Sequence, residues 1–313
     1  MEEKTYTPDE VAQLFQISKH TVYELIKRGE LRALKIGNKM RIEQAELDRY
    51  KDRAKAPPKR NRTEPSEISE QYFHPIRITG SHDILVEHFV KQASKALQLQ
   101  IQPSFIGSLE GLMMLYRGQS DIAAIHLQDP SSQEYNLPFI HQLFIYESIS
   151  VIRFSSREQG FIVAKGNPKE ITSFRDLIRK EIQFVNRQKG SGTRFLLDSN
   201  LLSHGIKPEQ IKGYETEEWN HLTTASYISR GIADVTFGIR SAASHLDLDF
   251  VPITKEQFDL VFRFTNENKG YLTRLIKYLQ SNEFKSSLTD VEGYDIHELG
   301  TIIYQYNELE DIT

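Results

Sequence analysis

Strand-like and helix-like segments alternate along the chain from Pro75 onward, and no other feature of the sequence constrains the fold as strongly. The apolar runs IRITG and DIAAIHL predict buried strands, and the segments between such runs have helical periodicity. This alternation is typical of an α/β domain with parallel strands. Helices are expected from Ser81, from Ser108, after Asn220 and near FRDLIRK, and further strands at ISVIRF, GFIVAKGNP, IQFVN, ADVTFGI, DFVPI and DLVFRFT.

A serine follows a glycine at three of the predicted strand-to-helix turns. Ser81, Ser108 and Ser191 lie in the segments TGSHD, IGSLEG and KGSGTR. The first N–H groups of a helix have no partner within the helix and favour negative charge. In an open α/β sheet the ligand crevice lies beyond the carboxyl ends of the strands, so the three turns are expected to surround one small anion.

The third turn does not match other glycine-rich motifs. It lacks the Gly-x-x-x-x-Gly-Lys-Ser/Thr pattern of phosphate loops, and Lys189 replaces the first glycine of a nucleophile elbow. The alternative for each serine is that it only caps a helix. Arg194 and Asp198 are four residues apart on one helix face, so the alternative for Arg194 is that it pairs with Asp198 and has no role in ligand binding. For His126, the pattern is equally consistent with a histidine of the core.

The first 62 residues differ from the remainder in charge. They contain 15 Lys and Arg against 10 Asp and Glu, a net charge of +5, whereas the rest of the chain, with 24 against 33, carries −9. A basic head on an acidic body indicates a nucleic-acid partner for the head alone. Between them, residues 53–74 are polar and contain paired prolines, which predicts a tether.

Two short amphipathic segments in the head precede a hairpin and a third helix. Thr7 and Glu10 predict a capping box at the start of the first helix, and Ser18 is expected to cap the second. Alternating apolar residues on both sides of the Gly37-Asn38 pair predict a hairpin with a tight turn. A helix over about residues 44–50 closes the unit.

This order of elements, with the segments YTPDEVA, SKHTVY and KIGNKMRI, resembles the excisionase-type, MerR-like winged helix-turn-helix family over residues 1–52. The resemblance implies that the second helix enters the major groove of double-stranded DNA while the wing contacts the backbone beside it. The expected DNA-binding residues are Ser18, Lys19, His20, Thr21, Tyr23, Lys27, Asn38, Lys39 and Arg41. The alternative is a small protein-binding module whose basic residues are only a solvated face.

The body, residues 75–313, resembles the periplasmic-binding-protein superfamily and, more closely, its molybdate-binding-like members. The motifs that carry the resemblance are GSHD, GSLEG, GQSDIA, NRQKGSGTR and GIADVTFGI, in that order. It implies a two-lobed, type II α/β fold with residues 75–150 and 241–313 in lobe I and residues 160–239 in lobe II. The expected ligand-binding residues are Ser81, His82, Ser108, Leu109, His126, Ser191, Gly192, Thr193, Arg194 and Thr224.

Composition argues against several other classes of protein. The chain has no cysteine, which excludes disulfides, thiolate metal sites and cysteine nucleophiles, and it has no His-Glu-x-x-His motif. No apolar run approaches about 20 residues, and the start MEEKTYTPDE is unlike a secretory signal, so a cytoplasmic protein without membrane contact is expected. No acid/base pair or partnered nucleophile stands out, so neither enzymatic activity nor a metal or cofactor is expected.

Together these features predict a one-component transcriptional regulator. Its head binds operator DNA in a homodimer, and its body senses a small oxyanion, molybdate or tungstate first, in the cleft between the lobes. Ligand-induced closure then alters the spacing or orientation of the heads. Three alternatives stay open: a sensor of a small organic anion bound by Arg194, an enzyme linked to molybdenum-cofactor biosynthesis, and an architectural protein whose body mediates assembly.

Overall fold

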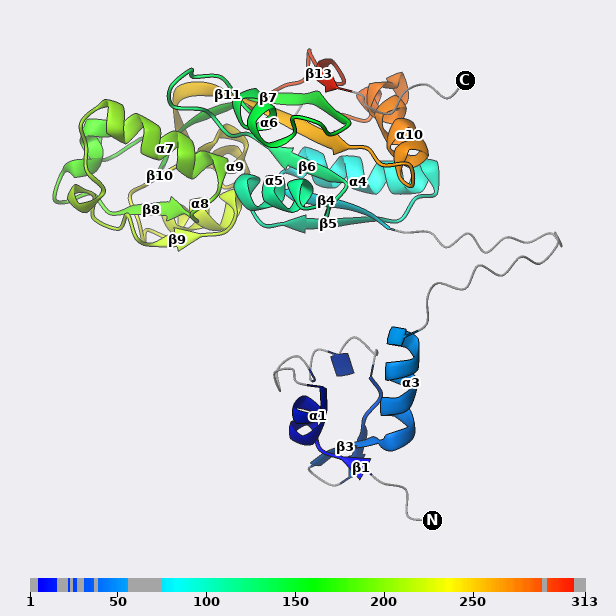
Figure 1. The fold of residues 1–313 in the computed structure, drawn as a ribbon. Coiled ribbons are helices and arrows are strands. Elements are labelled where there is room, and N and C mark those ends of the chain that lie inside the picture. The colour runs from blue at the N-terminus through cyan, green and yellow to red at the C-terminus, as the bar shows by residue number, and fades with distance from the viewer. Residues whose placement is uncertain are drawn as a thin grey trace. The chain divides into compact units, whose positions relative to one another are not determined.

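The computed structural model describes residues 5–15, 22, 25–26, 31–36, 39–55, 75–288 and 292–306. The chain divides into two compact units, residues 1–70 and residues 71–313 (Figure 1). Each unit has its own hydrophobic core. Among the described residues, no helix has both the length and the apolar character that a bilayer-spanning segment needs.

The N-terminal unit combines a three-stranded antiparallel sheet with helices. The strand order in the sheet is β1-β3-β2, and helices α1 and α3 belong to the same unit. The bounds are β1 (Thr5–Tyr6), α1 (Pro8–Phe15), β2 (Leu34–Ile36), β3 (Lys39–Glu43) and α3 (Gln44–Lys55). The predicted capping box of α1 is confirmed, because Glu10 Oε2 accepts from the Thr7 N–H at 2.7 Å and Thr7 Oγ1 accepts from the Glu10 N–H at 3.2 Å.

The head has a small apolar core that ties the helices to the wing. Val11 of α1, Leu31 and Ile42 of β3 are fully buried in it. The predicted hairpin is present as β2 and β3, and the predicted third helix as α3. Most of the predicted second helix, including its expected cap Ser18, lies outside the described residues.

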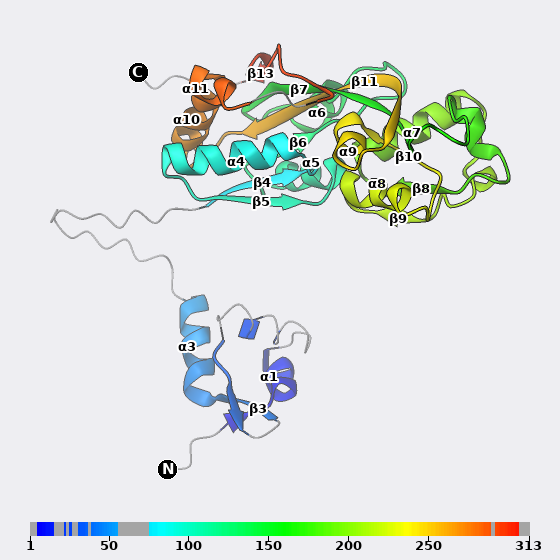
Figure 2. The same ribbon diagram turned by 180° about the vertical axis from the view of Figure 1, so that it is seen from behind.

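Lobe I of the C-terminal unit is built on three parallel strands in the order β5-β4-β6. Helices α4, α10 and α11 cover one face of this sheet, and α5 and α6 cover the other (Figures 1 and 2). The bounds are β4 (Ile76–Gly80), α4 (Ile84–Leu97), β5 (Ile101–Phe105), α5 (Ser108–Tyr116), β6 (Ile122–Ile125), α6 (Leu137–Leu143), α10 (Lys269–Gln280), α11 (Asn282–Ser286), β12 (Tyr294–Asp295) and β13 (Ile302–Tyr306).

Lobe II has a second, smaller set of strands in the order β10-β8-β9. One face packs against α7 and the 3₁₀ helix η1, and the other packs against α8 and α9. The bounds are η1 (Phe174–Ile178), β8 (Phe184–Arg187), α7 (Gly192–Ser203), η2 (Pro208–Gln210), β9 (Glu217–Glu218), α8 (His221–Ser229), β10 (Val235–Ile239) and α9 (Arg240–His245). The helix expected near FRDLIRK is therefore the 3₁₀ helix η1.

Two long antiparallel strands, β7 (Ile149–Val163) and β11 (Asp249–Arg263), run through both lobes, and each has 15 residues. In lobe I, β11 pairs with β6, and in lobe II, β7 pairs with β10. The sequence predicted two strands in place of each, because polar residues interrupt the apolar runs. Several of these polar residues are buried, among them Arg157, Gln159 and Glu256, and Arg157 pairs with Glu256 across the ribbon, so the strands continue.

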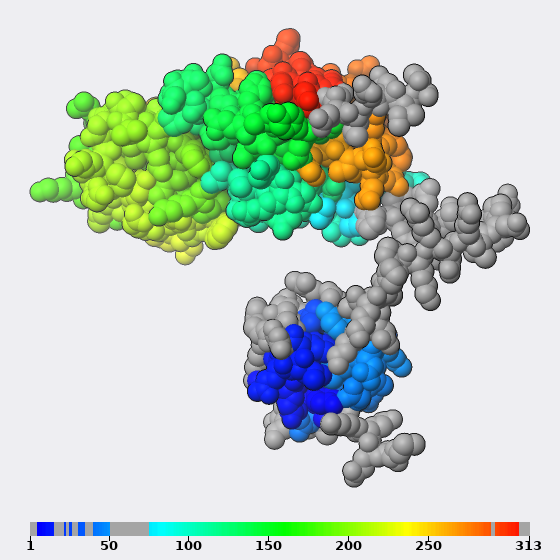
Figure 3. Space-filling model, viewed as in Figure 1, coloured from blue at the N-terminus to red at the C-terminus, as the bar shows by residue number. Residues whose placement is uncertain are grey.

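The boundary between the lobes lies further along the chain than residue 241. Helix α9 packs against α8 and β10, and Ala242 and Ala243 share a core with Ile162 of lobe II. The first half of β11 pairs with the lobe II half of β7. On the face drawn in Figure 3, the atoms of the two lobes meet. The lobes therefore join through the ribbon and along a shared contact surface.

Candidate functional site

The three serine-bearing turns meet at the boundary between the lobes. Ser81 Oγ lies 2.9 Å from Ser108 Oγ in lobe I, and the Leu109 N–H donates to the carbonyl of Gly190 in lobe II at 3.1 Å. The first turn is close-packed: a Cβ at Gly80 would lie 2.1 Å from the Ala124 carbonyl oxygen. Only glycine fits there, and it lets the chain turn and carry Ser81 into the site.

The serines differ in their relation to the helices that follow them. Ser191 caps α7 as predicted, since its Oγ accepts from the Arg194 N–H at 3.2 Å. Ser81 does not cap α4, because that helix begins at Ile84 and Asp83 is its N-cap. Ser108 is the first residue of α5, after the N-cap Gly107. The hydroxyls of Ser81 and Ser108 therefore point away from cap positions and toward each other.

His126, directly after β6, connects the two lobe I serines. Its Nε2 lies 3.0 Å from Ser81 Oγ, and its backbone N–H donates to Ser108 Oγ at 3.2 Å. On the other side of the ring, Nδ1 lies 2.8 Å from Glu256 Oε2. The ring also stacks on Phe258 with 5.4 Å between centroids. Burial is the main cause that lowers the pKa of His126.

The N-terminus of α7 closes the site from lobe II. A Cβ at Gly192 would lie 2.3 Å from the His126 carbonyl oxygen and 2.4 Å from its Nδ1, so only glycine permits this approach of the lobes. Thr193 Oγ1 accepts from Gln159 Nε2 at 3.2 Å. Ser191 and Thr193 are each 1% exposed, and His126 is 2% exposed.

Arg187, at the end of β8, is a buried guanidinium without a carboxylate partner among the described residues. Its Nε and Nη2 donate to the backbone carbonyls of Glu218 and Trp219, and its Nη1 has no hydrogen-bond partner there. Burial, and next the nearby charge of Arg157, lower the pKa of Arg187 to about 9. The guanidinium is still positively charged at neutral pH, and within the described part of the chain no carboxylate forms an ion pair with it.

A buried ion network lies behind the serines on the long ribbon. Arg157 Nε donates to Glu256 Oε1 at 2.6 Å, and its Nη1 donates to Asp83, which also accepts from the Tyr294 hydroxyl at 2.8 Å. Burial raises the pKa of Glu256, but Arg157 and His126 lower it more, to about 2. The network joins the start of α4 to the middle of the ribbon and keeps Glu256 ionised.

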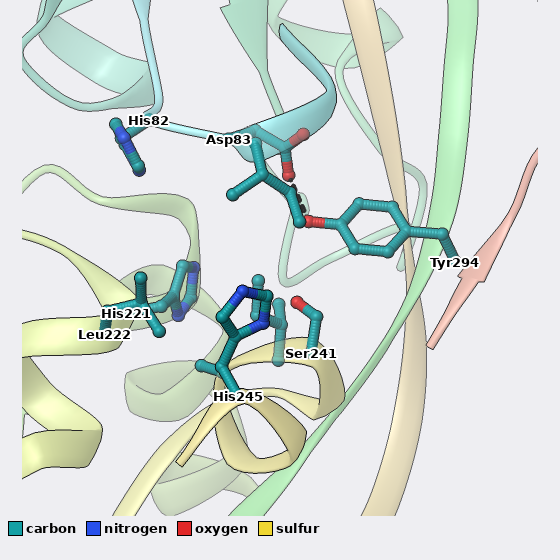
Figure 4. A pocket seen from close by; sticks show the side chains of 10 residues that line it. His82, Asp83, His221, Leu222, Ser241, His245 and Tyr294 are labelled. Atoms are coloured by element: carbon teal, nitrogen blue, oxygen red, sulfur yellow. Dashed lines mark hydrogen bonds between the residues drawn. The ribbon is translucent and has the colours of Figure 1, made fainter. Parts of the chain in front are cut away.

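A small pocket opens beside this network (Figure 4). Its volume is about 20 Å³, enough for about one water molecule. It is lined from lobe I by His82 and Asp83, from α8 by His221 and from α9 by His245. His221 Nδ1 has no partner among the described residues, and burial lowers the pKa of His221 well below its usual value.

Several expected ligand-binding residues have other partners. Arg194 Nε donates to both oxygens of Asp198 at 3.1 Å, and Arg194 Nη1 lies 3.0 Å from Glu217. Thr224 Oγ1 donates to the Asn220 carbonyl, inside α8. His82 pairs with Glu87 at the rim of the pocket. Leu109 takes part through its backbone N–H rather than its side chain.

Sequence reasoning missed the charged part of the site. Arg187 stands in the quoted segment NRQKGSGTR, but nothing in a linear pattern shows which arginine lacks a carboxylate. The other residues that it missed come from three separate segments of the chain: Arg157 and Gln159 lie together in SSREQ, His221 lies 62 residues after Gln159, and Glu256 lies 99 residues after Arg157. The signal that was available is the run of polar residues SSREQ in the middle of an apolar strand.

In the head, Arg41 is half-buried on β3, where it pairs with Leu34 of β2. Lys39 begins the same strand, and nothing is described of its side chain. The other expected DNA-binding residues lie outside the described part of the chain: Ser18, Lys19, His20, Thr21, Tyr23, Lys27 and Asn38. Within the described ranges, no cluster of three His, Cys, Asp or Glu side chains is able to hold a metal ion.

A family model of the PBP superfamily domain matches residues 90–280, which is more than half of the chain. The chain belongs to the PBP superfamily. A second model, of a helix-turn-helix domain, matches residues 5–55. This PBP-superfamily protein therefore carries an N-terminal, excisionase-type helix-turn-helix domain, as the sequence motifs predicted.

The PBP-superfamily chain has full-length and partial relatives. It is 34% identical over 307 residues to the uncharacterized protein YvgK of Bacillus subtilis, covering 97% of this chain and 99% of that protein. It is 37% identical over 109 residues to an uncharacterized protein in the 5′ region of a ferredoxin 2Fe-2S gene of Clostridium pasteurianum, covering 34% and 96% of the two chains.

Among solved structures, the tungstate ABC transporter from Geobacter sulfurreducens superposes with a TM-score of 0.51 at 12% identity. The superposition covers 69% of this chain and 99% of that one. This likeness shows the two-lobed fold of the PBP superfamily. The domains of the chain point to DNA binding and ligand binding as its roles.

Proposed function

We propose that this protein is a cytoplasmic, ligand-responsive transcriptional regulator whose body senses a small oxyanion, molybdate or tungstate first. The ligand is bound between the lobes by Ser81, Ser108, Ser191, Gly192, Thr193 and, in addition to the residues expected from the sequence, Arg187. The head binds operator DNA, and paired heads in a homodimer contact two half-sites. Ligand stabilises the closed lobes and changes how the heads are presented.

The unpaired guanidinium of Arg187 is the observation that carries the proposal. A buried charge is stable only when it is paired, and the two carbonyls that Arg187 contacts do not neutralise it. Arg157 adds positive charge nearby, although Asp83 and Glu256 balance that residue. An anion between the lobes would supply the missing negative charge and accept from Nη1.

The packing of the site favours a small ligand. Ser108 and Gln159 are 0% exposed, and Thr193 is 1% exposed, so the lobes must separate for any ligand to enter. The surrounding groups are hydroxyls, a guanidinium and the first N–H groups of α7, all suited to oxygen acceptors. A larger organic anion would hold the lobes further apart than the contact of Gly192 with His126 allows.

A second candidate function is hydrolysis. Ser81, His126 and Glu256 follow one another in hydrogen-bond order, which is the order of nucleophile, base and orienting carboxylate in serine hydrolases. Binding is preferred because the Ser81 N–H, one possible oxyanion donor, already donates to the Ala124 carbonyl at 2.9 Å. Release of p-nitrophenol from p-nitrophenyl acetate or phosphate, lost in Ser81→Ala, would favour the hydrolase.

A thermal-shift panel of molybdate, tungstate, sulfate, phosphate and several carboxylates tests the proposal. An anion at about 100 times its Kd stabilises the folded protein by about 2.7 kcal/mol, a readily measured shift in Tm. Sulfate is the demanding control because it has the same charge and tetrahedral shape but is smaller. A response to carboxylates alone would support the organic-anion alternative, and no response to any anion would support the assembly role.

The DNA arm of the proposal has its own test. Binding to operator fragments from the protein's own promoter is measured with and without the anion, over a range of salt concentrations. Affinity should fall steeply with salt, as for any protein that neutralises phosphates, and should change when anion is added. Sedimentation of the protein–DNA complex reports whether two heads bind one operator. An affinity that is identical with and without anion would refute the coupling.

A further inference from the structure

His126, Ser81 and Ser108 form a closed ring of hydrogen bonds. The His126 N–H donates to Ser108 Oγ at 3.2 Å, the two serine oxygens are 2.9 Å apart, and Ser81 Oγ lies 3.0 Å from His126 Nε2. All three side chains are at most 5% exposed. The direction of each hydrogen bond is therefore set by neighbouring protein groups.

Glu256 determines which ring nitrogen of His126 carries the proton. Burial raises the pKa of the Glu256 carboxyl, but Arg157, which contacts one of its oxygens, is the main cause that lowers it and keeps the carboxyl ionised. An ionised carboxylate only accepts hydrogen bonds, so His126 Nδ1, at 2.8 Å, must be the donor. In the neutral ring, Nε2 is then an acceptor.

When the His126 imidazole is neutral, both serine hydroxyl protons are engaged in hydrogen bonds. Ser81 donates its hydroxyl proton to Nε2, and Ser108 donates its proton to Ser81, since the Ser81 proton is already committed. Neither hydroxyl then has a proton left for an anion. If His126 is protonated, Nε2 donates to Ser81 instead, and at least one serine proton is released to face the space between the lobes.

The charges around His126 allow this change when an anion arrives. Glu256 on β11 is the one carboxylate in contact with the ring among the described residues, and it favours the protonated form. Arg157 on β7 and Arg187 on β8 oppose protonation, and so does burial. His221 on α8 is a further titratable neighbour, and Tyr135, whose hydroxyl has no partner in the described part of the chain, lies close enough to Glu256 and Arg157 to interact with their charges. A bound anion would offset the two arginines.

We propose that His126 takes up a proton whenever the site binds an oxyanion, so that the anion and one proton bind together. This inference rests on the proposed function, because it concerns the same site. It identifies the preferred ligands as fully ionised oxyanions, which accept hydrogen bonds at every oxygen. Anion affinity then rises as pH falls, by up to tenfold per pH unit in the range where free His126 is neutral and bound His126 is charged.

Isothermal titration calorimetry with molybdate at pH 7.5 tests the proposal on the full-length protein. Molybdate is fully ionised at this pH, so any proton taken up comes from the buffer. Three buffers with different enthalpies of ionisation are compared. The observed heat should vary with the buffer enthalpy with a slope near one proton per anion. Heat that does not depend on the buffer would overturn proton uptake, whereas no binding heat at all would refute the proposed function.

A variant pair assigns the proton to His126. His126→Asn should bind molybdate with a buffer slope near zero, and its matched control, His204→Asn on the exposed end of α7, should keep the slope near one. Uptake that persists in His126→Asn would overturn the assignment. If that variant does not fold, nitrogen-15 NMR of the wild-type histidine rings decides. His126 should change from the Nδ1–H tautomer to the imidazolium on adding molybdate, and a ring that stays neutral would overturn the proposal.

Discussion

Arg187 and Arg194 lie seven residues apart, on either side of the loop between β8 and α7, and both are buried. Arg194 contacts two carboxylates and lies 4.2 Å above the Tyr214 ring, so its charge is balanced within lobe II. Arg187 contacts only carbonyl oxygens among the described residues. The difference shows that burial alone does not separate a structural arginine from an anion-binding one; the presence of a carboxylate partner does.

The largest expected effect separates the two arginines by anion affinity. Arg187→Met should raise the Kd for molybdate by about 100-fold or more, because loss of one partner of a buried charge pair costs about 2–5 kcal/mol. Arg194→Met should change the Kd by less than about threefold. Calorimetric titration of both variants measures this contrast. Equal losses in the two variants would remove the distinction and return Arg194 to the site.

The next largest effect on the Kd for molybdate is expected at Gly192, which lies between the two arginines in the sequence and contacts His126 of lobe I. Gly192→Ala places a Cβ 2.3 Å from the His126 carbonyl oxygen, so the lobes cannot close as described. We expect the Kd for molybdate to rise by about tenfold or more, equivalent to about 1.4 kcal/mol. Gly270→Ala is the matched control, because no atom lies within 4 Å of a Cβ there. Unchanged affinity in Gly192→Ala would mean that the anion binds without this closure.

The free energy of unfolding should rank the two variants in the opposite order, with the larger loss in Arg194→Met. Arg194→Met removes the cation that pairs with both Glu217 and Asp198, and we expect the free energy of unfolding to fall by about 1–2 kcal/mol. Arg187→Met removes a buried charge that contacts no carboxylate of the described residues, so the anion-free protein should be as stable as the wild type or more stable. Urea unfolding at pH 7 without added anion measures both. A large loss in Arg187→Met would reveal a structural role.

The smallest effect concerns the cap between the two arginines. Ser191→Ala removes the hydroxyl that accepts from the Arg194 N–H, and a lost N-cap costs about 1 kcal/mol. We expect a modest decrease in Tm together with a severalfold increase in the Kd for molybdate. Ser203→Ala, at the other end of α7, is the control for the affinity. A decrease in Tm without any change in Kd would leave Ser191 with the capping role alone.

Local patterns in the sequence predicted much of the fold. These features depend on residues within a few positions of one another: the capping box of Thr7 and Glu10, the hairpin of β2 and β3, and the caps Ser191 and Asn220. The family motifs gave the two-lobed α/β architecture. Such features are encoded by turn and capping preferences that act over short distances.

The charged part of the site depends on long-range pairing, which no local pattern encodes. The i, i+4 spacing of Arg194 and Asp198 was visible in the sequence as a competing role, and the structure contains that ion pair. The pairing of Arg157 with Glu256, 99 residues later, was not visible, nor was the lack of a carboxylate beside Arg187. For the same reason SSREQ was taken as a break between strands, although it is the centre of β7.

The long ribbon of β7 and β11 has a consequence for how the body comes apart. Its two strands contribute to the cores of both lobes, and their backbone ladder continues across the boundary. If one lobe unfolded, half of each strand would lose the core against which it packs, and Arg157 and Glu256 would be exposed to solvent. The body should therefore denature in a single cooperative heat-absorption peak, with no stable one-lobed fragment surviving limited proteolysis.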